Sequence, residues 1–103
     1  MTFYLVKAKV KNNIFKLRQE MESGKIKKLI PYGNSLHNSL KNAKKDDKDW
    51  IYAVWIEEDH YSPPLAIERK SVLDRYFTDI VREIVESEEA GWAKIKDKTS
   101  IWI

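Results

Sequence analysis

WIYAVWIEED, residues 50–59, is the most apolar run of the chain, and the fold is best interpreted from it. Aromatic and β-branched residues dominate this run, which is typical of a central strand in a sheet. A second strand is predicted over residues 3–10, FYLVKAKV, because the residues at even positions are all apolar and form one face. These two segments predict the centre of a β-sheet.

Two helices are predicted between these strands. Asn13 can cap the first helix, in which apolar residues that include Leu17 and Met21 recur at intervals of three and four residues. Asn34 or Ser35 can cap the second helix, which carries apolar residues on one side and lysines on the other. Both helices are therefore expected to pack one face against the sheet.

The remaining segments complete the predicted architecture. Residues 25–33, KIKKLIPYG, are interpreted as a short strand, and residues 44–49, KKDDKD, as a turn. The apolar periodicity of residues 72–85 predicts a long amphipathic helix, and residues 91–103 predict one or two further strands. The sequence therefore predicts a single α+β domain over residues 1–103, with a mixed sheet of four or five strands covered by about three helices.

The composition is that of a globular domain. Apolar residues make up 43% and charged residues 34% of the 103 residues, which excludes wholesale disorder. The absence of cysteine excludes disulfides and thiolate metal sites, and with the many Lys, Glu and Ile residues it is typical of thermophilic proteins. No run approaches the roughly 18 apolar residues that span a bilayer, so we expect a cytoplasmic protein without a membrane partner.

The charge is distributed unevenly along the chain. The net charge of +3 combines +9 over residues 1–45 with −8 over residues 46–89. A basic half is typical of proteins that bind the phosphates of DNA or RNA. The lysines predicted to bind nucleic acid are Lys25, Lys27, Lys28, Lys41, Lys44 and Lys45. Alternatively, the two halves neutralise each other within the fold or across a homodimer.

Two conformations are open for residues 62–70. In the first, Ser62 caps a helix that begins at Pro63 and continues to about residue 88. In the second, LAIERK is a strand and Ser71 caps the following helix. Only the strand would project Glu68 and Lys70 from the same face, because strand side chains alternate with a period of two.

The strand conformation would assemble a metal site. Asp59 ends the preceding strand and would lie near Glu68 on a neighbouring one. Two carboxylates are suitable ligands for Mg²⁺ or Mn²⁺, and the bound ion keeps waters that can act as nucleophiles. Lys70 beside Glu68 could orient an attacking water or offset charge on a phosphate.

Residues 58–82, which contain Asp59 and the motif IERKSVLD, resemble the signature of XPF-type endonucleases within the PD-(D/E)xK nuclease group. In that family an acid ends one strand, Glu-Arg-Lys lies on the next, and an Asp opens the following helix. The resemblance implies that Asp59 and Glu68 are metal ligands and that Glu68, Lys70 and Asp74 are catalytic. It departs from the family in having Glu58 where a glycine is usual.

Three functions are therefore expected from the sequence. The first is a small nuclease that depends on Mg or Mn and acts on DNA. The second is a non-catalytic module that binds nucleic acid through the basic N-terminal half. The third is a protein-interaction or dimerisation domain in which acidic and basic regions meet. The conformation of residues 65–70 separates the first function from the other two.

Overall fold

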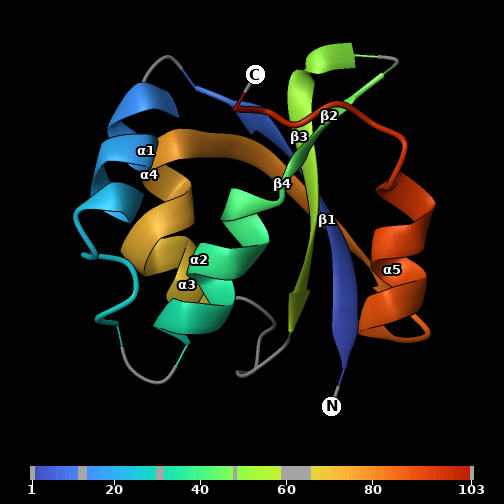
Figure 1. Ribbon diagram of the computed structural model, residues 1–103, viewed down its shortest axis with the longest axis horizontal. Coiled ribbons are helices and arrows are strands. Elements are labelled where there is room, and N and C mark those ends of the chain that lie inside the picture. Colours follow the sequence, from blue (N-terminus) through green and yellow to red (C-terminus); the bar gives the residue numbers. More distant parts are fainter. Residues whose placement is uncertain (1, 12–13, 30–31, 48, 59–65, 103) are drawn as a thin grey trace.

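The computed structural model describes residues 2–11, 14–29, 32–47, 49–58 and 66–102. A four-stranded sheet forms its centre, with the strand order β2-β3-β1-β4 (Figure 1). The strands are β1 (Phe3–Val10), β2 (Lys44–Asp46), β3 (Asp49–Glu58) and β4 (Phe77–Val85). All neighbouring strands are antiparallel, so the sheet is not mixed as the sequence predicted.

Helices cover both faces of the sheet. The helical elements are α1 (Ile14–Glu22), α2 (Gly33–Lys41), α3 (Ala66–Glu68), the π-helical η1 (Arg69–Leu73), α4 (Asp74–Tyr76) and α5 (Glu88–Ile95). The elements α3, η1 and α4 follow one another without a break and, with α1 and α2, lie on one side of the sheet, whereas α5 lies on the other (Figure 1). The prediction of an α+β domain is confirmed. None of the helices in the described ranges is long and apolar enough to cross a membrane.

The order of elements is that of a split β-α-β arrangement. The chain passes from β1 through α1 and α2 to β2, then through β3 and the helical segment 66–76 to β4. This β-α-β-β-α-β order with β1 and β3 paired at the centre is the ferredoxin-like topology, to which α5 is added. The topology alone carries no function, because unrelated activities share it.

The main core lies between the sheet and the three helical segments on its first face. Val6 of β1 pairs with Trp55 of β3, and both are completely buried. The ring of Trp55 contacts that of Phe77, with centroids 5.0 Å apart. On the opposite face, Gly91 lets α5 approach the sheet, because a Cβ there would lie 2.7 Å from Cδ1 of Ile56. Both faces of the central strands are therefore covered.

Several predicted elements are confirmed. The strands expected over residues 3–10 and 50–59 correspond to β1 and β3, although Asp59 lies outside the described part of the chain. Leu17 and Met21 are buried in α1 as expected, and the predicted cap Asn13 also lies outside the described part. The second helix begins at Gly33, slightly earlier than predicted, without a side-chain cap.

Other predictions are wrong. Residues 25–28 form turns and not a strand, and residues 44–46 form an edge strand and not a turn. The tail forms α5 and a single β-bridge from Ser100 to Lys44, where strands were predicted. These segments are short, so pairing with distant residues decides their conformation more than local propensity does.

The predicted helix over residues 72–85 is the largest error. Its first part is helical, but residues 77–85 form β4, which pairs with β1. The apolar residues at 80, 81, 84 and 85 fit a helical period, yet Thr, Ile and Val make up five of the nine residues of β4. Asp79, with φ of 53°, lies where the register with β1 shifts. Pairing with β1 overrides the helical periodicity.

Both conformations weighed for residues 62–70 are also corrected where the structure describes them. Residues 66–76 are helical, so IERK is not a strand. The helix does not continue to residue 88, because the backbone becomes extended at Phe77, with φ of −133° and ψ of 153°. A short helical segment followed by a strand replaces both alternatives.

Candidate nucleic-acid interface

The helical segment 66–76 separates the residues predicted to be catalytic. Glu68 is completely buried, whereas Lys70 is exposed, as expected for side chains two positions apart on a helix. Asp74 is exposed and forms an ion pair with Arg69, with 3.5 Å between Nε and Oδ1. Asp59 lies outside the described residues. The structure therefore does not place Lys70 or Asp74 beside Glu68, and the nuclease function stays a prediction.

A second acid, missed in the sequence, lies near Glu68. Glu57 of β3 is 1% exposed, and neither of its carboxylate oxygens forms a hydrogen bond with another described residue. Burial and the charge of Glu68 raise the pKa of Glu57 well above its usual value. The Trp55 indole N–H lies nearby without a well-aligned hydrogen bond and opposes this only in part. Within the described ranges, no group of three or more acidic or His side chains could hold a metal ion.

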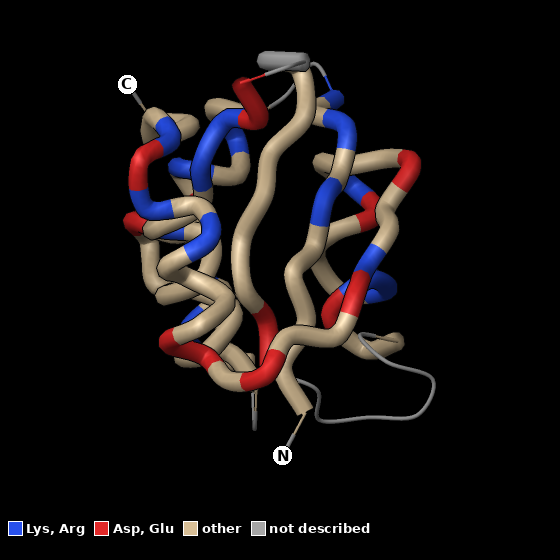
Figure 2. The backbone as a smooth tube through the Cα atoms, turned by 90° about the vertical axis from the view of Figure 1, so that its right-hand side faces the viewer, with Lys and Arg blue, Asp and Glu red and all other residues tan. Residues whose placement is uncertain are grey.

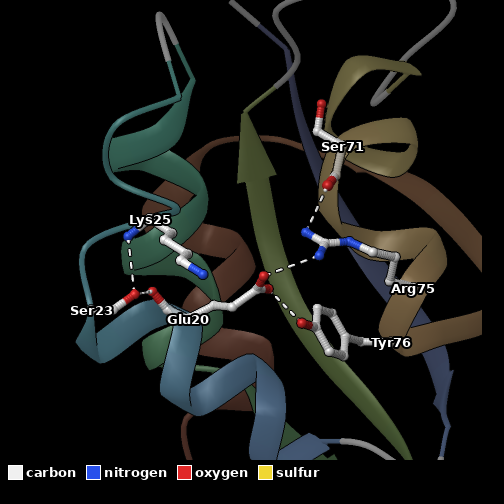
Figure 3. Close-up of polar contacts among 6 residues, drawn as sticks. All are labelled: Glu20, Ser23, Lys25, Ser71, Arg75 and Tyr76. Atoms are coloured by element: carbon white, nitrogen blue, oxygen red, sulfur yellow. Dashed lines mark hydrogen bonds and ion pairs between the residues drawn. The ribbon is translucent and has the colours of Figure 1, made fainter.

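A polar cluster links α1 to α4 (Figure 3). The carboxylate of Glu20 accepts hydrogen bonds from the Tyr76 hydroxyl at 2.5 Å and from Nη1 of Arg75 at 3.0 Å. Arg75 also donates from Nη2 to the carbonyl oxygen of Ser71 at 2.9 Å. Partial burial raises the pKa of Glu20, but the two hydrogen bonds outweigh burial and leave it below the usual value. The cluster neutralises its own charges and holds α1 on the helical segment.

A basic groove lies between α1, α2 and the C-terminal residues Ser100 and Trp102. The charged side chains that line it are Arg18 and Glu22 of α1, Lys27, and Lys41 of α2, and His37 of α2 also lines it. Trp102 forms part of its wall. The groove has a volume of about 470 Å³, within the range of sites that take small organic ligands.

Gly33 fixes the position of Lys27 relative to α2. A Cβ at residue 33 would lie 2.3 Å from the carbonyl oxygen of Ile26 and 2.8 Å from that of Lys27. The N–H of Gly33 donates to the carbonyl oxygen of Leu29 at 2.6 Å. Only glycine allows this close approach, so the turn that carries Lys27 packs directly on the start of α2.

The C-terminal residues are held beside β2 and α2 by hydrogen bonds. The N–H of Lys45 donates to the carbonyl oxygen of Thr99 at 2.7 Å, and that of Ile101 donates to Ala43 at 3.1 Å. The indole N–H of Trp102 donates to the carbonyl oxygen of Leu40 at 2.8 Å. These contacts fix the Trp102 ring at the groove.

The groove is electropositive. Arg18 is paired with Glu22 at 3.0 Å, but Lys27 and Lys41 form no ion pair with any described residue. Partial burial and the charges of Lys27 and Lys41 lower the pKa of His37, so its imidazole is neutral at pH 7. The Nδ1 atom of His37 is buried and has no hydrogen-bond partner among the residues described. Two lysines without acidic partners thus lie near one neutral histidine, and Arg18 lines the same groove.

The structure brings together only part of the predicted lysine set. Lys27 and Lys41 meet at the groove, and Lys28 is exposed in the same turn as Lys27. Lys25 lines a separate hollow beside Glu20, and both Lys44 and Lys45 are half-buried in β2.

The sequence analysis missed Arg18, His37 and Trp102. The four-residue spacing of His37 and Lys41 places both on one face of α2 and could have indicated their proximity. No local signal links Trp102 to Lys27, because their contact with one groove depends on the tertiary fold.

No protein-family model, curated protein or solved structure matches this chain. The functional inference therefore rests on the groove and its surroundings, because the ferredoxin-like topology is shared by unrelated activities.

Proposed function

We propose that this protein binds nucleic acid, with its phosphate backbone in contact with the basic groove. The observation that carries the proposal is the convergence of Lys27 and Lys41 beside a neutral His37, without acidic partners on the two lysines. Cations held close together repel one another, and a phosphate between them would relieve that repulsion. Phosphate contacts from lysine supply most of the affinity in sequence-independent binding.

Cations on the other side of α1 favour a polyanion over a small anion. Lys16, Lys25 and Arg75 line a second hollow there, and both lysines are exposed. Glu20 occupies part of this hollow and neutralises Arg75. The basic side chains thus flank α1 on both sides, as expected for a surface that contacts successive phosphates.

The side of the molecule that carries α5 has a different character. Figure 2 views this side and shows basic and acidic residues mixed along the chain. Glu88 and Glu89 lie in the first turn of α5, and Lys94 lies in its last turn. Lys94 and Lys96 are exposed, so they provide a matched control for the lysines of the groove.

The test is a fluorescence anisotropy titration of a labelled oligonucleotide at low salt. The double variant Lys27→Glu, Lys41→Glu should bind at least about tenfold more weakly, because two phosphate contacts become repulsive. The control variant Lys94→Glu, Lys96→Glu changes the net charge equally and should bind within about twofold of the wild type. Equal losses in both variants, or no binding by the wild type, would contradict the proposal.

A further inference from the structure

We infer that the groove takes an unpaired base as well as phosphate, so that the protein binds single-stranded nucleic acid in preference to duplex. This inference rests on the proposed function and names its ligand more closely. The observation behind it is that the wall of the basic groove is partly aromatic and apolar, since Trp102 and Met21 line it together with the cations. Contact with phosphates alone needs no such wall.

Trp102 is placed as a stacking surface. Its indole N–H donates to the carbonyl oxygen of Leu40, and its backbone N–H donates to Oγ of Ser100 at 3.1 Å. The ring packs against the main core and also lines the groove, while remaining partly exposed. The polar edge of the indole is therefore occupied within the protein, and the part of the ring in the groove is available for a flat ligand.

The surrounding charges suit a nucleotide. Lys27, Lys41 and Arg18 lie in the same groove as the Trp102 ring, so a stacked base would have its own phosphates near cations. Aromatic rings beside basic side chains are the usual means by which proteins bind single strands without reading their sequence. The guanidinium group of an arginine can also stack on a base, and Arg18 is partly exposed for such a contact.

Duplex nucleic acid cannot use the aromatic wall. In a duplex the bases are paired and stacked on one another, so their flat faces are not accessible and only the phosphates reach a basic surface. A single strand can turn a base out at little cost. The groove should therefore add affinity for single strands that duplex does not gain.

The experiment compares a short oligothymidylate single strand with a mixed-sequence single strand and its duplex, all of equal length, by anisotropy at fixed salt. The wild type should bind the single strands about tenfold more tightly than the duplex. Trp102→Leu keeps an apolar side chain and should lose about tenfold in affinity for single strands while its affinity for duplex stays within twofold. Circular dichroism of the variant verifies that it is folded.

A second measurement uses only the wild type, in case the variant does not fold. The indole N–H resonance of Trp102 should shift clearly further when single strand is added than when duplex is added at the same saturation. Equal affinity for single strand and duplex, or an unmoved Trp102 resonance, would overturn this inference while salt-dependent binding upheld the proposed function. Absence of binding to every oligonucleotide would overturn both.

Discussion

The basic groove and the buried acids Glu57 of β3 and Glu68 of α3 both place like charges close together, but in opposite surroundings. Lys27 and Lys41 are exposed at the surface beside His37. Glu57 and Glu68 are almost completely buried, and the charge of Glu68 raises the pKa of Glu57. Water screens the lysines, whereas burial strengthens the effect of the Glu68 charge on Glu57.

The difference concerns how each region can be neutralised. An external anion can reach the groove, so its charge is available for binding. Within the described ranges no cation accompanies Glu57, and a proton is the simplest means of removing its charge. The groove is therefore expected to respond to polyanions and salt, and the acid pair to pH.

Replacing Glu57 should have the largest effect on stability. The raised pKa means that the folded state holds its proton more tightly than the unfolded state does. The proton on Glu57 therefore stabilises the folded state fully at pH values below the unfolded-state pKa of about 4.5. This stabilisation is lost as the pH rises through the higher pKa of the folded state. Glu57→Gln cannot ionise, so at alkaline pH it should raise the free energy of unfolding by on the order of 1 kcal/mol relative to the wild type.

Urea unfolding of both proteins across the pH range checks this expectation. Glu58→Gln, on the opposite face of the same strand, is the control and should change the pH dependence much less. Parallel stability curves for the wild type and Glu57→Gln would show that the buried carboxyl is neutralised in some other way.

A smaller effect is expected for the pH dependence of nucleic-acid binding, in which the affinity should change by about threefold. The pKa of His37 is lowered by burial and by Lys27 and Lys41, and the other charged groups of the groove are Arg18 and Glu22. A bound phosphodiester would offset the charges of the two lysines and so raise the pKa of His37. Binding is then accompanied by uptake of a proton, so the affinity should increase as the pH falls through the pKa of His37. His37→Gln should bind with an affinity that is constant between about pH 8 and pH 6. If the affinity of this variant kept the pH dependence of the wild type, His37 would not be the group that takes up the proton.

The smallest effect is expected at the Glu20 cluster, where an acid already has its partners. Burial, the hydrogen bond to Glu20 and the charge of Glu20 raise the pKa of Tyr76 from 10.0 to about 12. Glu20→Gln should bring this pKa back towards 10.0, as measured by the tyrosinate absorbance in an alkaline titration. If one tyrosine of the Glu20→Gln variant still ionised with a pKa of about 12, the raised pKa of Tyr76 would not be due to Glu20.

The sequence predicted the elements whose local pattern has a single interpretation. The long apolar run of β3 and the clean alternation of β1 are compatible only with strands, and both are confirmed. Residues 77–85 combine apolar residues at helical spacing with many β-branched residues, and only the pairing with β1 selects the strand. Local patterns could not reveal that partner.

The sites were predicted less completely than the fold. Lys27 and Lys41 were expected to bind nucleic acid, but their meeting at Trp102 depends on Gly33 and on hydrogen bonds of the C-terminal residues. Glu57 has the same strand parity as the buried Trp55, so alternation along β3 already placed it towards the helices.

The decisive measurement for the groove is the salt dependence of binding to a single-stranded oligonucleotide. The logarithm of the association constant should fall linearly with the logarithm of the salt concentration, because each phosphate contact releases counterions. The variant Lys27→Gln, Lys41→Gln removes two contacts without adding repulsion, so its slope should be smaller in magnitude by about 1.4. Equal slopes for the variant and the wild type would contradict a phosphate-binding role for the groove.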